Sequence, residues 1–410
     1  MDDEHDELVE RFRDELPDDH RPYTDKYFMR SRQILEADET NPDVAVKVFA
    51  RGEGEIPDEA LAEAQAIVEE YAEPAFSDNG GELYLTEEDE FGSKDPLMVL
   101  KGKAQDVVEL ETMYLGAMSH HLSEANGVDT PTYEDMREEA AKVAELYDEA
   151  DVPFLYFGAR HYHWSKDDEL AAGVLDAGAV QTSTDVGSSN IDAEGVGTTP
   201  HFLTLTLAGS EDYSPANATR RTAELFDEHM DDDIPRTTLI DTFNREIDDA
   251  LDVARYFDEE RDGDDWTAKF RVDTCGENHA QGMDPADVDP ADDYRTGTGV
   301  RIEPVKALRD RLIEEGYGDN TEIILSSGFG DPDKAEAFVD AQHEYREESQ
   351  EKFGESYDLF HGVGAGSFDD GIHCTADIYA VDGEPMAKTG REQDIEAMET
   401  YIDEHMEQVI

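Results

Sequence analysis

Seven short apolar segments, separated by amphipathic stretches, follow one another along the chain from about residue 132. These segments are PFLYFGAR (153–160), AVQTSTD (179–185), TPHFLTL (199–205), TTLIDTF (237–243), KFRVDT (269–274), EIILSSG (322–328) and DLFHGVG (358–364). The helical segments between them are 165–176, 215–230, 244–258, 303–315 and 332–347. Repeated β-α units predict a parallel sheet with right-handed crossovers. Seven strands favour an irregular α/β barrel, and a doubly wound open sheet is the alternative.

The first 125 residues lack this regular alternation. The pattern predicts a strand at 43–51, a helix at 58–71, short strands near 82–86 and 97–101, and a largely buried helix at 109–124. We therefore predict a smaller N-terminal α+β domain over 1–125 and the barrel over 126–371. The C-terminal segment, 372–410, is free to pack with the first domain.

The chain carries 104 acidic and 33 basic residues, for a formal net charge of -71. Such a body repels itself at ordinary ionic strength, whereas molar salt shortens the screening length to about 3 Å. The acids lie on helix faces throughout the chain, and intrinsic disorder, which shares this charge, would lack the seven apolar segments. We expect a halophilic protein from a salty cytoplasm. No basic stripe is present to bind nucleic acid or an anionic membrane.

The cysteines, the N-terminal sequence and the length of the apolar runs bear on whether a structural zinc is expected and on where in the cell the protein is expected. Cys275 and Cys374 alone cannot form a structural zinc site or a disulfide framework, so no structural zinc is expected. The acidic N-terminus has no apolar signal region, and no apolar run approaches the ~20 residues that span a bilayer. These features predict a cytoplasmic protein.

Polar residues and glycines gather where the predicted strands end. They are Gly158 to Arg160, Thr184 and Asp185, Asp241 and Thr242, Asp273 and Thr274, Gly328 and Gly364. In a β/α barrel the active site is built at the carboxyl ends of the strands. The sequence therefore predicts an active site at one rim of the barrel.

Two glycine-rich segments follow consecutive predicted strands, SSGFGDPDK (326–334) and HGVGAGSF (361–368). Backbone N–H groups of such turns, close to a helix N-terminus, can hold a phosphate. One such turn alone commonly serves only chain geometry. Two together at one rim predict phosphate binding.

Arg160, Arg271 and Asp273 lie on strands that lead to this rim. An arginine offers a planar, permanently charged donor to a phosphate, although an ion pair with one of the many acids is the alternative. Asp273 is two residues after Arg271 and should face the same side of its strand. The pair could bind an anion together with a sugar hydroxyl or Mg²⁺.

Histidines are the remaining candidates. A lone histidine such as His201 is more often a core or surface residue, but its position at the rim suits an acid, a base or a nucleophile. His161 and His163 share one side of the chain, yet no clear third ligand accompanies them, and no metal site is predicted. The neighbouring pair at 120–121 is expected to pack or cap.

Three segments together resemble one family. TDKYF (24–28), LETMYLGAMSHHLS (110–123) and HGVGAG (361–366) are similar, in order and spacing, to the nicotinate phosphoribosyltransferases and the related nicotinamide enzymes. The resemblance covers most of the chain. It implies an N-terminal α/β domain, an irregular, roughly seven-stranded α/β barrel, and a homodimer with shared active sites.

The resemblance also implies roles for single residues. Tyr27 would reach from the partner subunit and stack on the pyridine ring, with Phe157 on the other face. His201 would be phosphorylated when ATP hydrolysis is coupled to the reaction, and Asp273 would act with it in catalysis. The other substrate-binding residues would be Arg160, Asp185, Asp241 and Arg271, and the 5′-phosphate would lie on Gly328, Gly330, Gly362 and Gly364.

The sequence departs from the family at two places. Asp185 stands where the family has a small polar residue, and a carboxylate there would repel nicotinate and favour nicotinamide. The family's Asp-Ser-Gly reads Asp-Thr-Cys-Gly at 273–276, and an insertion follows at 277–299. That insertion is either an active-site lid or a halophilic loop.

The resemblance therefore predicts an ATP-assisted transfer of phosphoribosyl from phosphoribosyl pyrophosphate to nicotinate in NAD biosynthesis, with Mg²⁺ and with ATP as co-substrate. Nicotinamide or another base is the alternative substrate. A sugar-phosphate barrel lyase is a further alternative, but it needs a reactive lysine at a strand end, and Lys269 precedes its strand. A regulatory dimer that only binds the ligand is the last alternative.

Overall fold

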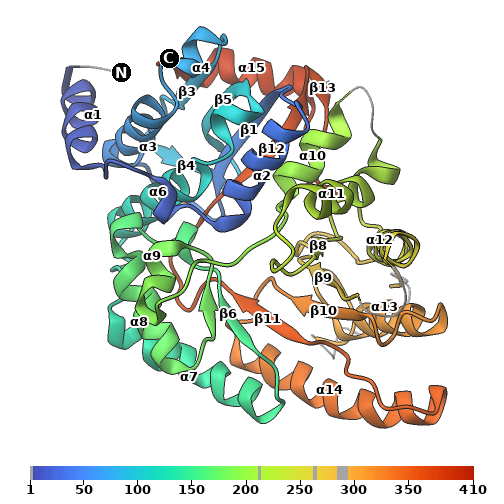
Figure 1. Ribbon diagram of the computed structural model, residues 1–410. Coiled ribbons are helices and arrows are strands. Elements are labelled where there is room, and N and C mark those ends of the chain that lie inside the picture. The colour runs from blue at the N-terminus through green and yellow to red at the C-terminus, as the bar shows by residue number, and fades with distance from the viewer. Residues whose placement is uncertain (1–2, 211–213, 262–265, 284–293) are drawn as a thin grey trace.

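The computed structural model describes residues 3–210, 214–261, 266–283 and 294–410 (Figure 1). Two six-stranded sheets organise them, with strand orders β13-β12-β1-β5-β3-β14 and β7-β6-β11-β10-β9-β8. A short pair, β2 (Gly54–Glu55) and β4 (Glu90–Phe91), stands apart from both. None of the helices within the described ranges is long and apolar enough to cross a membrane.

The first sheet is antiparallel and combines strands from both ends of the chain. Its strands are β1 (Asp43–Ala50), β3 (Glu82–Thr86), β5 (Pro96–Lys103), β12 (Cys374–Val381), β13 (Glu384–Pro385) and β14 (Met406–Gln408). β12 pairs along the whole of β1, from Val44 opposite Val381 to Ala50 opposite Cys374. The C-terminal segment thus belongs to the sheet of the N-terminal region.

Helices from the N-terminal region and the last helix of the chain accompany this sheet. They are α1 (Asp3–Glu15), α2 (Lys26–Ala37), α3 (Asp58–Tyr71), α4 (Ala75–Asp78), α5 (Ala104–Val107), α6 (Glu111–Ala125) and α15 (Ile395–His405). As the absence of a polar stripe predicts, α6 is buried along most of its length. It lies beside α3 and against β12 (Figure 1).

The second sheet is parallel throughout. Its strands are β6 (Phe154–Tyr156), β7 (Gln181–Thr182), β8 (Thr237–Leu239), β9 (Ala268–Val272), β10 (Thr321–Leu325) and β11 (Gly362–Ala365). Its longer helices are α7 (Tyr133–Glu149), α8 (Asp167–Ala177), α11 (Pro215–His229), α12 (Glu246–Glu260), α13 (Ile302–Glu314) and α14 (Pro332–Phe353), and α9 (Asp185–Ser188) is a single turn. The predicted β-α alternation is present.

One predicted strand is wrong, because residues 199–205 lead into helix α10 (His201–Gly209). The run from Phe202 to Ala208 is buried on all sides, and periodicity cannot distinguish a buried helix from a buried strand. The parallel sheet therefore has six strands rather than seven. No pairing joins β7 to β8 among the described residues, so the sheet is a half-barrel.

α10 also changes the predicted division of the chain at residue 126. Phe202, Leu203 and Leu205 pack in the core of the first sheet, as do Leu225 and Phe226 of α11. Residues 202–230 thus contribute to the core of the antiparallel sheet. Residues 126–371 do not form a barrel whose core is wholly separate.

Candidate active site

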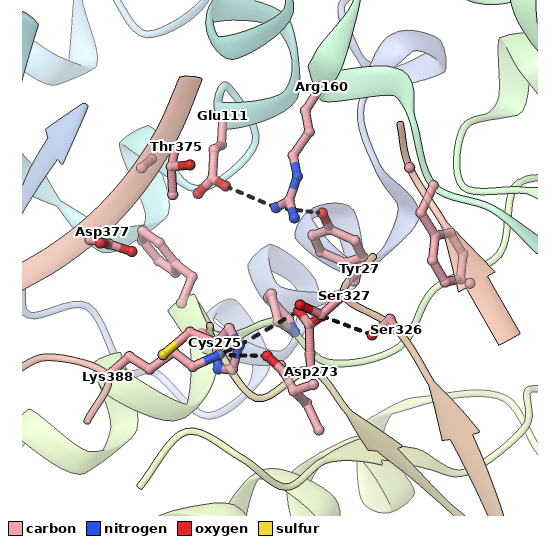
Figure 2. Close-up of a pocket in the computed structure, with 18 of the residues that line it drawn as sticks. Tyr27, Glu111, Arg160, Asp273, Cys275, Ser326, Ser327, Thr375, Asp377 and Lys388 are labelled. Atoms are coloured by element: carbon pink, nitrogen blue, oxygen red, sulfur yellow. Dashed lines mark hydrogen bonds and ion pairs between the residues drawn. The ribbon is translucent and has the colours of Figure 1, made fainter. Parts of the chain in front are cut away.

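A cavity of ≈ 490 Å³ takes its lining from both sheets. It meets the carboxyl ends of β6, β9, β10 and β11, and on the other side α2, α6, α10 and β12 (Figure 2). Among the residues predicted from the sequence, those that line it are Tyr27, Phe157, Arg160, His201, Arg271, Asp273, Gly328, Gly330 and Gly364. The fold thus brings together, in one space, residues more than 300 positions apart in the sequence.

His201 begins α10, directly after Pro200. Its Nδ1 lies 2.9 Å from Oγ1 of Thr242, and its Nε2 lies 2.8 Å from Nζ of Lys388. An ammonium group can only donate, so Nε2 accepts and Nδ1 carries the proton that goes to Thr242. Burial and the positive charge of Lys388 both lower the pKa of His201. The imidazole is therefore neutral, with its Nε2 lone pair directed at Lys388.

Lys388 holds this group of residues together and was missed by the sequence analysis. Its Nζ lies 2.5 Å from Oδ2 of Asp241 and donates to the backbone carbonyl of Asp273 at 3.0 Å. Asp241 does not line the cavity; its side chain is wholly buried beneath His201, 3.6 Å from Nε2. The signal was available, since Lys388 and Arg391 are two cations close together in a chain that has few.

Arg271 and Asp273 occupy the end of β9, as alternation along a strand predicts. Nε of Arg271 donates to Oγ of Ser326 at 2.9 Å, and its Nη2 lies 3.4 Å from Oδ2 of Asp273. Burial alone would raise the pKa of Asp273, but Arg271, Lys388 and Arg160 together hold it below its ordinary value. Asp273, drawn in Figure 2, is consequently an ionised carboxylate at neutral pH.

Tyr27, Phe157 and Arg160 line another part of the cavity. Nη1 of Arg160 lies 3.5 Å from the hydroxyl of Tyr27 (Figure 2), and the guanidinium of Arg271 stands 5.2 Å from the centre of the Phe157 ring. The resemblance implied that Tyr27 would come from a partner subunit. In the structure it lies in the cavity of its own chain, because α2 packs against this chain's own core.

Glu111, at the start of α6, is a second residue that the sequence analysis missed. Its Oε1 lies 3.7 Å from Nη1 of Arg160. Burial raises the pKa of Glu111 to about 8, against the opposing effect of Arg160. A largely protonated carboxyl group therefore faces the cavity at neutral pH, and no local sequence pattern distinguishes it from the other acids of the chain.

The two glycine-rich segments meet at the ends of β10 and β11. Ser327 and Gly328 both have positive φ, 75° and 81°, so the first turn is tightly wound. Nζ of Lys334 donates to the Ser327 carbonyl at 2.7 Å and fixes that turn. At Gly330 a Cβ atom would come within 2.3 Å of the Ser367 carbonyl oxygen, so only glycine fits between the two loops. These loops present backbone to the cavity just before α14 begins.

Two predicted residues lie outside the cavity. Gly362 is buried in β11, where a Cβ atom would come within 2.9 Å of Cδ1 of Ile324, so its glycine serves strand packing. Asp185 is paired with Lys26 at 2.7 Å and accepts from the backbone N–H of Gly195 at 2.8 Å. The carboxylate of Asp185 is thus held by these contacts outside the cavity, and the predicted repulsion of a nicotinate carboxylate stays a prediction.

The segment after Asp273 contributes to the cavity through Cys275 and Gly276. In the insertion predicted at 277–299, Glu277 pairs with Arg51 at 2.9 Å and with Lys94 at 2.7 Å. Residues 284–293 lie outside the described residues, so the lid and the halophilic loop both stay predictions.

We compared this architecture with known proteins. No protein-family model and no curated protein matches the chain. Solved structures do match. A nicotinate phosphoribosyltransferase from Vibrio cholerae aligns with a TM-score of 0.60 at 13% identity, over 93% of this chain and 96% of that one. One from Porphyromonas gingivalis aligns with a TM-score of 0.57 at 14% identity, over 93% and 97%.

A Saccharomyces cerevisiae protein described as a candidate nicotinate phosphoribosyltransferase aligns with a TM-score of 0.61 at 15% identity, over 93% of this chain and 96% of that one. This chain has the fold of these proteins. The resemblance seen in the sequence is thus confirmed at the level of fold, over nearly the whole length of the chain. Identities of this size carry the fold alone, and the activity has to be argued from the cavity.

Proposed function

We propose that this chain is a phosphoribosyltransferase that joins nicotinate to phosphoribosyl pyrophosphate in NAD biosynthesis. In that reaction the ring nitrogen of nicotinate forms a bond to C1′ of the ribose. The bond from C1′ to the pyrophosphate oxygen breaks, and the products are nicotinate mononucleotide and pyrophosphate. The fold shared with nicotinate phosphoribosyltransferases supports this proposal.

The observation that carries the proposal is that the cavity is lined by cations although the chain as a whole is strongly acidic. In a chain with a net charge of -71, the cations Arg51, Arg160, Arg271, Lys388 and Arg391 line one cavity and outnumber the acids Glu111, Asp273 and Asp377 there. A ligand that carries several phosphates and a carboxylate needs such cations, and over the whole chain acids outnumber cations by 104 to 33. The backbone of the two glycine-rich loops adds neutral donors for the 5′-phosphate.

The other lining residues suit the sugar and the base. Phosphoribosyl transfer develops positive charge on the ribose in the transition state, and the ionised Asp273 stands where it could stabilise that charge. Its carboxylate oxygens are also the ligands that Mg²⁺ prefers, and a Mg²⁺ ion would neutralise the departing pyrophosphate. Tyr27 and Phe157 offer aromatic rings to a flat pyridine.

His201 suits the proposed ATP assistance. Its Nε2 has a lone pair, so it could attack the γ-phosphorus of ATP, with the bond to the ADP oxygen breaking. Lys388 beside Nε2 would then balance the charge of the phosphoryl group. Water would later hydrolyse the phosphohistidine to inorganic phosphate and regenerate the imidazole.

A homodimer forms part of the proposal because the resemblance implies one. The cavity of a single chain already contains Tyr27, so a partner would complete this site with other residues or enclose it. Light scattering in molar KCl would give the mass, and a monomeric, fully active protein would contradict the shared site.

The lyase alternative needs an uncharged lysine facing the cavity. Lys388 is paired with the buried Asp241, and Lys334, whose pKa burial lowers to about 7, donates to the Ser327 carbonyl and does not line the cavity. Neither presents a free amine. Borohydride treatment with a sugar phosphate should accordingly trap no covalent adduct.

The direct test is an assay in molar KCl with Mg²⁺, phosphoribosyl pyrophosphate and either nicotinate or nicotinamide, with and without ATP. We expect nicotinate mononucleotide and pyrophosphate in equal amounts, faster with ATP, and much less product from nicotinamide. His201→Ala should lose the acceleration by ATP while it still binds phosphoribosyl pyrophosphate. Binding of both ligands without any product would favour the regulatory dimer, and consumption of neither base would overturn the proposal.

A further inference from the structure

A second cluster of functional side chains lies outside the cavity. Glu63 of α3, His121 of α6 and His163, which precedes the short helical turn Trp164–Lys166, present ligand atoms that all lie within 4.8 Å of one another. Nε2 of His121 is 2.7 Å from Oε2 of Glu63, and Nε2 of His163 is 3.0 Å from Oε1. None of the three lines the cavity.

Several contacts hold the side chains of this cluster in place. Glu63 is 1% exposed, and its carboxylate also accepts from Nε1 of Trp164 at 2.8 Å. The rings of His121 and His163 each lie 5.0 to 6.0 Å from another histidine ring, with His120 at 5.0 Å from both. A single hydrogen bond to the Glu63 carboxylate would need one imidazole, whereas three imidazole rings are grouped beside it.

From this arrangement we infer that Glu63, His121 and His163 bind a divalent transition-metal ion of the zinc class. Two imidazole nitrogens and a carboxylate oxygen are a common zinc donor set, with metal–ligand distances of about 2.0–2.2 Å. In a tetrahedron of that size the ligand atoms stand about 3.4 Å apart. The present separations of 2.7 and 3.0 Å, which involve the two different oxygens of Glu63, would widen by about 0.7 and 0.4 Å, and the two imidazole nitrogens, no more than 4.8 Å apart, would adjust with them.

Proton balance permits the exchange. Both imidazoles now direct Nε2 at the carboxylate, and the proton that each ring holds there would move to its Nδ1 when the metal takes Nε2. Nδ1 of His163, which now accepts from the backbone N–H of Ser165 at 3.2 Å, would then donate to Oγ of Ser165, 2.8 Å away. The fourth position would hold water or His120, whose Nδ1 already lies 2.9 Å from Oγ1 of Thr130.

The ion would connect segments that are distant in sequence. Glu63 and His163 are 100 residues apart, and His163 follows Arg160 by only three positions. A metal bond at His163 would therefore tie the segment that carries Arg160 to α3 and α6. No structural zinc was predicted, because the chain has only two cysteines and no third ligand is apparent beside His161 and His163 in the sequence. In the fold His161 lines the cavity instead, and the residues that join His163 are His121 and Glu63, which are distant in sequence.

The test uses the full-length protein, freed of metal with a chelator and re-equilibrated with Co²⁺ or Zn²⁺ in molar KCl. High salt suppresses loose binding of cations to the acidic surface. We expect one metal ion per chain after gel filtration, a Co²⁺ absorption spectrum typical of tetrahedral nitrogen and oxygen ligands, and a higher melting temperature. His121→Gln and His163→Gln keep an N–H donor for Glu63, and each should weaken binding at least tenfold.

His20→Gln is the matched control, because His20 pairs with a buried carboxylate, Glu109, at 3.3 Å but has no second imidazole beside it. It should retain one metal ion per chain. The proposal is overturned if the wild type retains no stoichiometric metal, or if both cluster variants retain as much as the wild type. Should a variant fail to fold, an octahedral, oxygen-only Co²⁺ spectrum of the wild type would also overturn it.

Discussion

Nζ of Lys388 lies 2.8 Å from Nε2 of His201 and 2.5 Å from Oδ2 of Asp241. One ammonium group thus fixes the tautomer of the histidine and neutralises a carboxylate that is wholly buried. Removing it would leave Asp241 without its cation, 3.6 Å from the imidazole, with the backbone N–H of Asp273 still donating to its carboxylate. His201 and the stability of the fold therefore depend on the same residue.

Lys388→Met should raise the pKa of His201, because the positive neighbour that lowers it disappears. The loss of the partner of Asp241 should cost about 3–5 kcal/mol of unfolding free energy. Histidine-selective NMR measures the pKa, and salt-supported chemical denaturation measures the free energy. Lys101→Met removes a surface pair with Glu399 and should change neither. An unchanged His201 pKa in Lys388→Met would contradict this role.

Arg271→Ala should raise the KM for phosphoribosyl pyrophosphate by about 10- to 100-fold, the range for one charge-assisted hydrogen bond. Arg271→Lys keeps the charge but loses the planar fork that reaches both Ser326 and Asp273, so it should recover only part of the loss. Arg255→Ala, which removes an exposed pair with Asp252, is the control and should leave KM unchanged. Equal effects of Arg271→Ala and Arg255→Ala would remove Arg271 from the binding site.

Most of the residues singled out at strand ends line one cavity, whereas the number of strands in the parallel sheet was predicted wrongly. Residues at strand ends, such as Arg271 and Asp273, could be located because alternation and the barrel rim fix where such side chains point. Residues 199–205 were assigned to a strand because a fully buried helix shows no polar stripe. Hydrophobic periodicity arises when one face of a helix packs on the core and the other meets solvent. α10 has no solvent face over 202–208, so it shows no such periodicity.

Residues missed by the sequence analysis are those whose role depends on contacts between distant segments. Lys388 and Glu111 each lie outside the strand ends, and their surroundings form only when β12 pairs with β1 and α6 packs beneath them. Asp185 is a different case: its position matches a family pattern, but it lies outside the cavity and pairs with Lys26. A local pattern cannot report which partner a carboxylate will find.

Gly364 and Gly362 are two residues apart on β11. Substituting each in turn should distinguish an effect on the shape of the cavity from an effect on the packing of the strand. A Cβ atom at Gly364 would come within 2.3 Å of the Phe157 ring, which lines the cavity. Gly364→Ala should therefore displace that ring and raise the KM for nicotinate several-fold. Gly362→Ala meets Ile324 and Pro153, which do not line the cavity, and should lower the melting temperature without altering KM. The reverse pattern would show that Phe157 does not contact the base.

Glu111 should make the stability of the fold depend on pH. Its pKa is raised from 4.5 to about 8 in the folded chain, so between these values the unfolded chain has lost a proton that the folded chain keeps. The slope of unfolding free energy with pH is then negative, and stability from this group is lost as pH rises from about 5 to 8. Glu111→Gln cannot ionise and should escape this loss. Relative to the wild type it should gain on the order of a few kcal/mol at pH 8 and little at pH 5. Denaturation of both proteins in molar KCl at several pH values checks this, and a difference that is constant across pH would show that Glu111 is ionised in the fold.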